Sequence, residues 1–229
     1  MTWVKICATT SLDDAQIAAE TGADALGFIF APSARRVSPK DVAKITAKLP
    51  KAIEKIGVFV NQRPEIIVDT VQDAGLTGVQ LHGSEELALV RELRKRAIAA
   101  GIGGLRVLKG LHARELMPEH PESAYGITFV RGAAELVDGV LLDSGTPERR
   151  GGTGRTFDWD EAAPMVRLLA RKHNVVVAGG LNAQNVTRAM KLFGPWGVDV
   201  VSGVEREPGK KDPEKIKAFI AAVRAAEGA

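Results

Sequence analysis

The chain of 229 residues is 45% hydrophobic and 26% charged, and its net charge is only +3. These proportions are typical of a soluble globular protein, no apolar run is long enough to span a bilayer, and no block of basic residues favours nucleic-acid binding. The single cysteine excludes an intramolecular disulfide, neither CxxC nor HExxH occurs, and the N-terminus lacks a secretory signal pattern, so we expect a cytoplasmic protein without a structural metal.

Short apolar runs alternate with amphipathic segments along the whole chain. The runs predict eight strands, at residues 3–7, 25–30, 55–60, 78–81, 105–109, 139–143, 175–178 and 198–202. Between them, apolar residues recur at helical spacing in four clear cases, around Val42, Val90, Val186 and Ile216. The pattern therefore predicts alternating strands and one-sided helices.

Helix start signals agree with this pattern. Ser11, Ser38, Asn182 and Asp212 each precede a helical segment, and their side chains are good N-caps. The exception is the region of residues 111–136, where Pro118, Pro121 and Gly126 should break any long helix. We expect a loop or a short helix there.

Eight buried strands alternating with helices favour one closed parallel barrel over residues 1–229 rather than an open sheet. No Gly-rich dinucleotide fingerprint follows the first strand, which weakens the open-sheet alternative. In such a barrel the active site lies at the carboxyl ends of the strands. The polar residues that end or follow the apolar runs are therefore the candidates: Cys7, Arg36, Asn61, Gln80, His82, Lys109 and Asp143.

Glycine-rich loops follow the late strands, as GGTG at 151–154, AGGLN at 178–182 and SGVE at 202–205. Glycine lets backbone N–H groups approach an anion, and loops after the seventh and eighth strands of a barrel commonly bind phosphate. Tight turns alone would also explain each glycine. Two adjacent loops together favour a small phosphorylated substrate.

Three side chains each have a functional and a structural interpretation. Asp143 ends an apolar strand, where a carboxylate is costly unless it is solvated, hydrogen-bonded, capping a turn or functional. Arg36 is either a solvated loop charge or a fork for a substrate carboxylate. Cys7 is by residue statistics more often a small buried hydrophobe than a catalyst, but its place at a strand end favours chemistry.

The chain resembles the phosphoribosylanthranilate isomerases of tryptophan biosynthesis. The segments that carry the resemblance occur in the family's order: KICATT, GADALGFIFAPSARRVSP, GVFVNQ, GVQLHG, LLDS, GGTGRTFDW, AGGLNAQNV and SGVEREPGKKD. The resemblance runs from Lys5 nearly to the C-terminus, except over residues 111–135. It implies a single (β/α)8 TIM barrel, monomeric or homodimeric, that needs no cofactor.

The resemblance also implies an activity and a set of site residues. The activity is the Amadori rearrangement of N-(5'-phosphoribosyl)anthranilate to 1-(2-carboxyphenylamino)-1-deoxyribulose 5-phosphate. Cys7 would be the general base, Asp143 the general acid, and Arg36 the partner of the anthranilate carboxylate. The remaining substrate-binding candidates are Gln80, His82, Gly152, Gly154, Gly179, Gly180, Ser202 and Gly203.

Two departures from the family pattern lie beside these residues. The family usually has KICG, an apolar residue and Thr, whereas Ala8 and Thr9 follow Cys7 here. The family also usually has two serines before the SGVE glycine, and Val201 stands at the first of them. A drifted, non-catalytic phosphate-binding barrel, or another phosphosugar isomerase or epimerase, therefore remains an alternative at this point.

Overall fold

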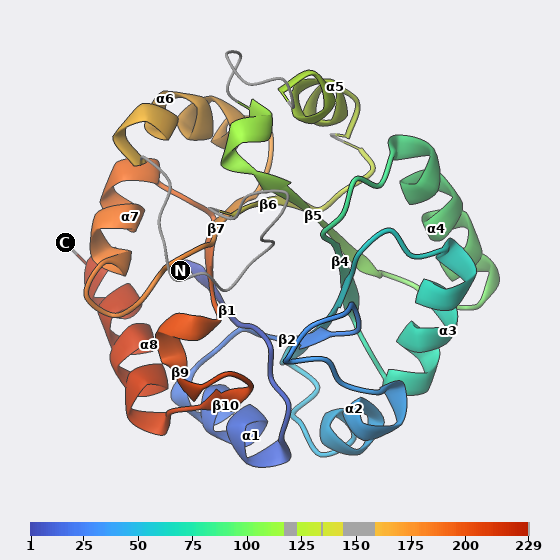
Figure 1. Ribbon diagram of the computed structural model, residues 1–229, viewed down its shortest axis with the longest axis horizontal. Helices are drawn as coiled ribbons and strands as arrows, with labels where there is room; N and C mark the ends of the chain where they lie inside the picture. The colour runs from blue at the N-terminus through green and yellow to red at the C-terminus, as the bar shows by residue number, and fades with distance from the viewer. Residues whose placement is uncertain (117–122, 134, 144–158, 229) are drawn as a thin grey trace.

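The computed structural model describes residues 1–116, 123–133, 135–143 and 159–228, and within these ranges eight parallel strands form a closed barrel in the order β1 to β8. Figure 1 looks down the barrel and shows the helices as an outer ring. The strands are β1 (Trp3–Ile6), β2 (Ala25–Ile29), β3 (Glu54–Phe59), β4 (Gly78–Leu81), β5 (Arg106–His112), β6 (Gly139–Asp143), β7 (Val175–Val177) and β8 (Gly197–Val200). The predicted barrel is confirmed.

Helices follow the strands in turn. They are α1 (Leu12–Thr21), α2 (Pro39–Thr46), α3 (Pro64–Ala74), α4 (Leu87–Ala99), α5 (Ser123–Ala133), α6 (Trp159–Ala170), α7 (Val186–Phe193) and α8 (Pro213–Glu227). A 3-10 turn, Ala113–Leu116, follows β5, and a second, Ser202–Val204, follows β8 and leads into the hairpin of β9 (Glu205–Glu207) and β10 (Lys210–Lys211). Among the helices of the described ranges, none is long and apolar enough to cross a membrane.

Three of the four predicted N-caps are confirmed. The side chains of Ser11, Ser38 and Asp212 accept hydrogen bonds from the first turns of α1, α2 and α8. The prediction for Asn182 is wrong, because α7 begins only at Val186, with Asn185 at its N-cap. Asn182 Oδ1 instead accepts from the backbone N–H groups of Gln184 and Asn185, so it caps the turn that precedes the helix.

The region after β5 is more regular than the sequence suggests. Gly126 lies inside α5, which runs for 11 residues, so the expectation that this glycine breaks the helix is wrong. The reason is a close approach between elements: a Cβ at position 126 would lie 2.1 Å from the backbone oxygen of Glu115. Glycine is therefore used here for packing α5 against the 3-10 turn.

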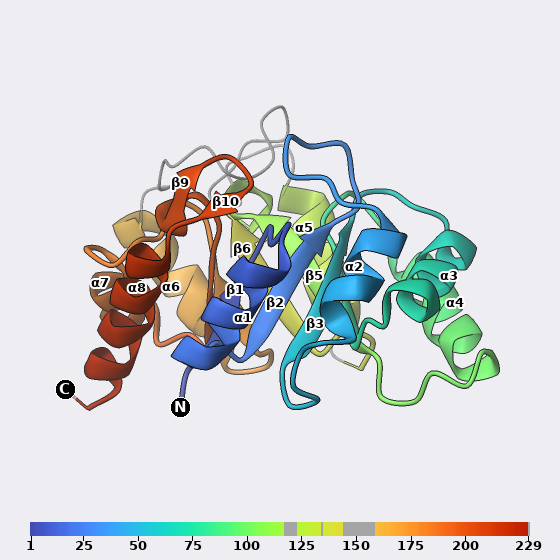
Figure 2. The same ribbon diagram turned by 90° about the horizontal axis from the view of Figure 1, so that it is seen from below.

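The barrel interior has an apolar floor with polar side chains above it. The floor cluster contains Trp3, Ala25, Ile56, Leu108, Leu141, Val176 and Ala178, and Trp3 stacks on Trp196 with 5.1 Å between ring centroids. Because side chains alternate along a strand, Trp3, Lys5 and Cys7 share one face of β1. Side chains therefore become more polar from the floor to the carboxyl ends of the strands, the upper rim in Figure 2.

The larger core fills the layer between the barrel and its helices. Because α8 contributes to this core, we expect the stability of the fold to depend strongly on α8. Phe219 of α8 is completely buried, whereas Ile98 of α4 is 74% exposed. We expect Phe219→Ala to lower the free energy of unfolding by about 3–5 kcal/mol in urea titrations, because the ring's contacts are lost and a cavity remains. Ile98→Ala is the control and should change it by less than about 0.5 kcal/mol. Equal losses from both substitutions would contradict this assignment of the core.

Candidate active site

A cavity of about 350 Å³ opens at the carboxyl ends of the strands. Seven of the residues predicted from the sequence line it together: Cys7, Gln80, His82, Asp143, Gly179, Gly180 and Ser202. They lie in or directly after β1, β4 and β6, and in the loops after β7 and β8, far apart in the chain. The fold therefore gathers most of the candidate residues around one space.

Of the other candidates, Lys109 lies on the outer face of the strands, paired with Glu85, and the candidates for binding the substrate lie beside this cavity or outside the described ranges. Gly203 follows Ser202 and lies against the Leu181 carbonyl oxygen, so that the loops after β7 and β8 touch. Arg36 lines a second hollow, which shares Ala31, Pro32 and Val60 with the first. Gly152 and Gly154 belong to residues 144–158, outside the described residues.

Cys7 lies just after the end of β1 with its side chain turned into the barrel. It is only 3% exposed, and its N–H donates to the Val200 carbonyl oxygen at 2.9 Å. The neighbouring strand makes room for it, because a Cβ at Gly27 would lie 2.4 Å from Cys7 Sγ. The missing side chain in β2 thus creates the space that the thiol occupies.

Ala8 adopts a left-handed backbone conformation with a φ of 61°. This region costs an ordinary residue about 1–2 kcal/mol, and glycine populates it without that cost. The conformation is held from both sides, since Cys7 N–H donates to Val200 and Thr9 N–H donates to Gly27, each at 2.9 Å. The left-handed turn directs the chain away from the barrel immediately after the thiol.

A row of polar contacts crosses the barrel at the base of the cavity. Lys5 Nζ donates to Asp199 Oδ1 at 2.8 Å and to Gln80 Oε1 at 2.9 Å. Gln80 Nε2 lies 3.1 Å from His82 Nδ1, and His82 Nε2 lies 3.4 Å from Asp143 Oδ2. Polar groups from β8, β1, β4 and β6 are thereby connected in one row.

The direction of these bonds assigns the protons of His82. The Gln80 oxygen already accepts from an ammonium group, so its NH₂ group faces the imidazole and donates to Nδ1. Nδ1 is then an acceptor, and in a neutral ring the proton is on Nε2, facing Asp143. His82 is thus oriented to donate a hydrogen bond to that carboxylate.

Burial and the charged groups around Cys7 have opposing effects on the pKa of its thiol. Burial raises the pKa of the thiol above its usual value, and the negative charge of Asp199 acts in the same direction. The positive charges of Lys5 and Lys211, and a hydrogen bond with Lys5, lower it, but the net shift is upward. Thiolate formation at this position therefore depends on nearby cations.

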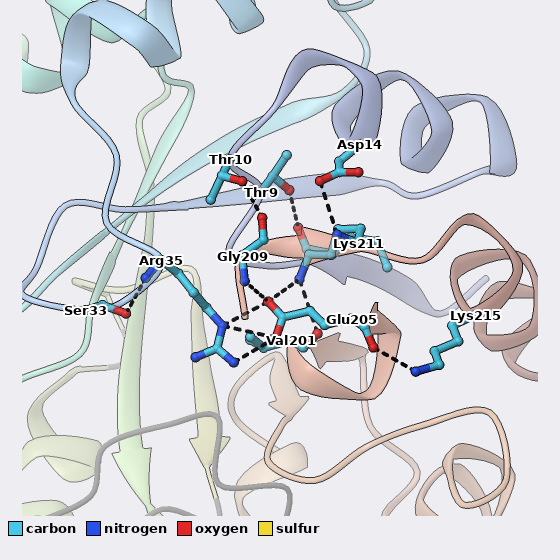
Figure 3. A network of polar contacts seen from close by, with 11 residues as sticks. Thr9, Thr10, Asp14, Ser33, Arg35, Val201, Glu205, Gly209, Lys211 and Lys215 are labelled. Atoms are coloured by element: carbon cyan, nitrogen blue, oxygen red, sulfur yellow. Dashed lines mark hydrogen bonds and ion pairs between the residues drawn. The ribbon is translucent and has the colours of Figure 1, made fainter. Parts of the chain in front are cut away.

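A second polar network joins the loop after β2 to the hairpin after β8 (Figure 3). Arg35 Nε and Nη2 donate to the two carboxylate oxygens of Glu205, at distances between 2.7 and 3.1 Å. Lys211 Nζ reaches the same carboxylate at 3.4 Å and the Val201 carbonyl oxygen at 3.2 Å. Burial alone would raise the pKa of Glu205, but these cations and the Gly209 N–H hold it below its usual range.

Three residues that sequence reasoning did not select belong to the site. Arg35 and Asp199 line the cavity, and Lys5 lies beneath it, completely buried. The signal for two of them was present: Lys5 and Asp199 are charged residues inside apolar strands, on the face that also bears Cys7 and Val201. For Arg35 no such signal exists, because adjacent arginines in a loop are equivalent until the loop's path is known.

In the described ranges, no group of three or more His, Cys, Asp or Glu residues could hold a metal ion. The groups around the cavity are instead suited to proton transfer and anion binding: a thiol, a carboxylate with a histidine, an arginine, and two loops with glycines.

Comparison with known proteins identifies relatives along the whole chain. The model of the family "N-(5'phosphoribosyl)anthranilate (PRA) isomerase" matches residues 4–106 and 118–222. The N-(5'-phosphoribosyl)anthranilate isomerase of Pelobacter propionicus is 42% identical over 218 residues, which cover 95% of this chain and 93% of that one.

Solved structures agree with this comparison. A phosphoribosyl anthranilate isomerase in complex with reduced 1-(o-carboxyphenylamino)-1-deoxyribulose 5-phosphate superposes with a TM-score of 0.78 and 36% identity, covering 98% of this chain and all (100%) of that one. A structure of "mutually generated monomers" of the dimeric isomerase from Thermotoga maritima gives the same TM-score of 0.78, 36% identity and coverage of 98% and 100%.

The close approach of Gly27 to Cys7 predicts an energetic coupling between these positions. Gly27→Ala should lower the free energy of unfolding by about 1–3 kcal/mol, because the added methyl group overlaps the sulfur. In a Cys7→Ala background, the same substitution should cost at least about 0.5 kcal/mol less. Urea titration of the four proteins in this cycle measures the coupling.

The matched control for this cycle is Gly103→Ala, since a Cβ at Gly103 would meet no atom within 4 Å. It should change stability by less than about 0.5 kcal/mol in either background. Additive effects of Gly27→Ala and Cys7→Ala would show that the sulfur does not occupy the space beside Gly27.

Proposed function

The chain belongs to the N-(5'-phosphoribosyl)anthranilate isomerase family and is a PRA isomerase of tryptophan biosynthesis; from this premise we propose that Asp143 is its general acid and Cys7 its general base. The observation that carries the proposal is that both side chains line one cavity from strands that are not neighbours: Cys7 follows β1, and Asp143 ends β6. A substrate in this cavity would lie between them.

In the proposed first step, Asp143 donates its proton to the ring oxygen of the substrate's aminofuranose. The bond between this oxygen and the anomeric carbon breaks, and the nitrogen lone pair forms the C=N bond of a Schiff base. His82 supports this step because its Nε2–H lies near Oδ2 of the carboxyl group and restricts its orientation. General acid catalysis of this kind typically contributes about 100- to 10,000-fold in rate.

In the second step, Cys7 as a thiolate removes the proton from C2 of the Schiff base. The C–H electron pair forms a C=C bond and the C=N electrons return to nitrogen, which gives an enolamine. This intermediate then tautomerises to the ketone product. The thiolate, not the thiol, is the form that can accept a proton, so the protonation state of Cys7 decides the rate of this step.

The two anionic ends of the substrate fit opposite parts of the site. Its phosphate is proposed to bind at Gly179, Gly180, Ser202 and Gly203, where backbone N–H groups in glycine-containing loops favour an anion. Its carboxylate is proposed to meet Arg36 in the adjoining hollow, whose apolar lining includes Phe30 and Phe59. An aromatic ring carrying a carboxylate matches that combination.

The enzyme is proposed to be a monomer or a homodimer, and the relative from Thermotoga maritima is described as dimeric. We also place the enzyme in the cytoplasm, where reducing conditions would keep Cys7 as a free thiol. Gln80 is proposed to act through its contacts with Lys5 and His82 rather than on the reacting atoms.

The roles of Cys7 and Asp143 are tested by conservative substitutions. Cys7→Ser and Asp143→Asn should each lower kcat by about 100-fold or more, because each removes one proton transfer. Both variants should bind reduced 1-(o-carboxyphenylamino)-1-deoxyribulose 5-phosphate within about threefold of the parent, since neither substitution changes the phosphate or carboxylate contacts. Turnover is followed by the loss of substrate fluorescence, and binding by calorimetry.

The decisive comparison is between turnover and binding. A variant that keeps both binding and most of its kcat would contradict the role of the substituted residue. A parent protein that binds the analogue but has no turnover would indicate a non-catalytic barrel.

The proposed contact between Arg36 and the substrate carboxylate is tested by comparing substitutions of Arg36 and of its neighbour Arg35. Arg36→Ala should weaken binding of the product analogue by about 10- to 100-fold, the usual worth of a charge-assisted hydrogen bond. The loss should nearly disappear with an analogue that lacks the carboxylate. Arg35→Ala is the matched control, because Arg35 is held by Glu205 and should show the same loss with both analogues. A carboxylate-dependent loss in Arg35→Ala instead would transfer the role to Arg35.

A further inference from the structure

Lys5 is a fully buried cation directly beneath the proposed base. It is 0% exposed, it lies two residues before Cys7 on the inward face of β1, and it is not among the residues that line the cavity. A buried ammonium group is costly unless it is paired and hydrogen-bonded. The mechanism described above leaves Lys5 without a role, although its position is next to the reacting thiol.

The contacts of Lys5 fix its ammonium group in place. Asp199 Oδ1 and Gln80 Oε1 accept two of its three N–H bonds, at 2.8 and 2.9 Å. Burial alone would lower the pKa of Lys5, but Asp199 and Cys7 raise it above its usual value, so the group stays charged at neutral pH. The third N–H bond is available to the sulfur of Cys7, which lies two residues further along the same face of the chain.

We propose that Lys5 is a positioning residue for the proton-transfer step: its ammonium group, held between Asp199 and Gln80, stabilises the thiolate of Cys7 from beneath while the substrate approaches from the cavity. The proposal rests on the proposed role of Cys7 as the base. Lys5 does not touch the substrate; it acts through the sulfur.

Several other charged groups face the thiol from the surrounding elements. They are Asp199 of β8, Lys211 of β10, Arg35 after β2, His82 after β4 and Asp143 of β6. Among those that affect its pKa, Lys5 contributes the largest downward effect, and Asp199 contributes an opposing upward one. Lys211 has a smaller downward effect and is itself bound to Glu205. Removing the charge of Lys5 should therefore raise the pKa of the Cys7 thiol, and removing the charge of Asp199 should lower it.

The effect can be measured directly because the chain has one cysteine. The ultraviolet absorbance of the thiolate, with Cys7→Ser protein as the blank, reports the titration of this thiol without any need for turnover. We expect Asp199→Asn to move the midpoint to lower pH and Lys5→Met to move it to higher pH. The Asn side chain still offers an oxygen to Lys5, whereas Met keeps the length of Lys without its charge.

Lys5→Met leaves a buried carboxylate without its cation and is expected to destabilise the fold, so a double variant is the central measurement. Lys5→Met/Asp199→Asn removes both charges together and retains two side chains of similar size. Its midpoint should rise above that of the parent by about one pH unit, because the thiolate loses the cation on its own strand, whereas Asp199 lies across the pairing on β8. The expected order of midpoints is Asp199→Asn, parent, double variant.

A second buried pair supplies the matched control. Lys109 and Glu85 are both completely buried and joined at 2.9 Å, but Lys109 lies near Phe129 of α5, on the opposite face of the strands from the cavity. Lys109→Met/Glu85→Gln should leave the Cys7 midpoint within about 0.3 of a unit of the parent's, on the scale where one unit is tenfold. The comparison separates a local charge effect from general damage to the barrel.

The last measurement is the dependence of kcat/KM on pH, on the acidic side of its maximum (the acidic limb). It should move with the thiol titration, so that the double variant loses about tenfold in kcat/KM below the midpoint while the Lys109 control does not. A double variant whose thiol titrates like the parent's would overturn the role of Lys5. A thiol titration that moves while the acidic limb stays fixed would instead overturn the role of Cys7 as the base.

Discussion

The pairing of β1 with β8 closes the barrel, and the geometry of the site depends on its register. In this register Lys5 lies opposite Asp199 and Ile6 lies opposite Val200, and the Cys7 N–H continues the ladder by donating to the Val200 carbonyl oxygen. A shift of β1 by one residue would turn Lys5 and Cys7 away from the interior and leave Asp199 there without its cation. The buried ion pair between β1 and β8 therefore fixes the positions of Lys5, Cys7 and the loop after β8 relative to one another.

Much of the fold followed from the alternation of apolar strands and amphipathic helices. The residues at the carboxyl ends of the strands were also predictable, because topology alone brings Cys7, His82 and Asp143 to one rim. The sequence did not show which individual side chains would contact one another or face the cavity. Which of Arg35 and Arg36 faces the cavity depends on the path of the loop, which is fixed by a bridge between Ile29 and Arg36 and by the contact of Arg35 with Glu205.

Local signals failed where packing overrode them. Gly126 is accommodated within α5 because another segment of backbone needs its space, and Asn182 caps a turn instead of the helix that follows. The β9–β10 hairpin is held by Lys211, Glu205 and Arg35, three residues whose charges appear unremarkable in sequence. Such networks are visible only once distant loops are in contact.

The two departures from the family pattern have different physical consequences. Ala8 adopts a left-handed conformation beside Cys7 at an energetic cost that glycine would not carry, and the backbone hydrogen bonds on either side hold it there. Val201 lines the cavity with a side chain that cannot donate a hydrogen bond, but its carbonyl oxygen still accepts from Lys211. The proposed acid, base and phosphate loops are all retained around both positions.

In the proposed mechanism, one cavity places the substrate between a thiol and a carboxyl group that divide the proton transfers. A crystal structure of the protein with reduced 1-(o-carboxyphenylamino)-1-deoxyribulose 5-phosphate tests it most directly. We expect Cys7 Sγ and an Asp143 oxygen to lie on opposite sides of the ligand's first two ribulose carbons, with the phosphate at Gly180 and Ser202. A ligand bound with either group beyond reach of these carbons and their oxygens would contradict it.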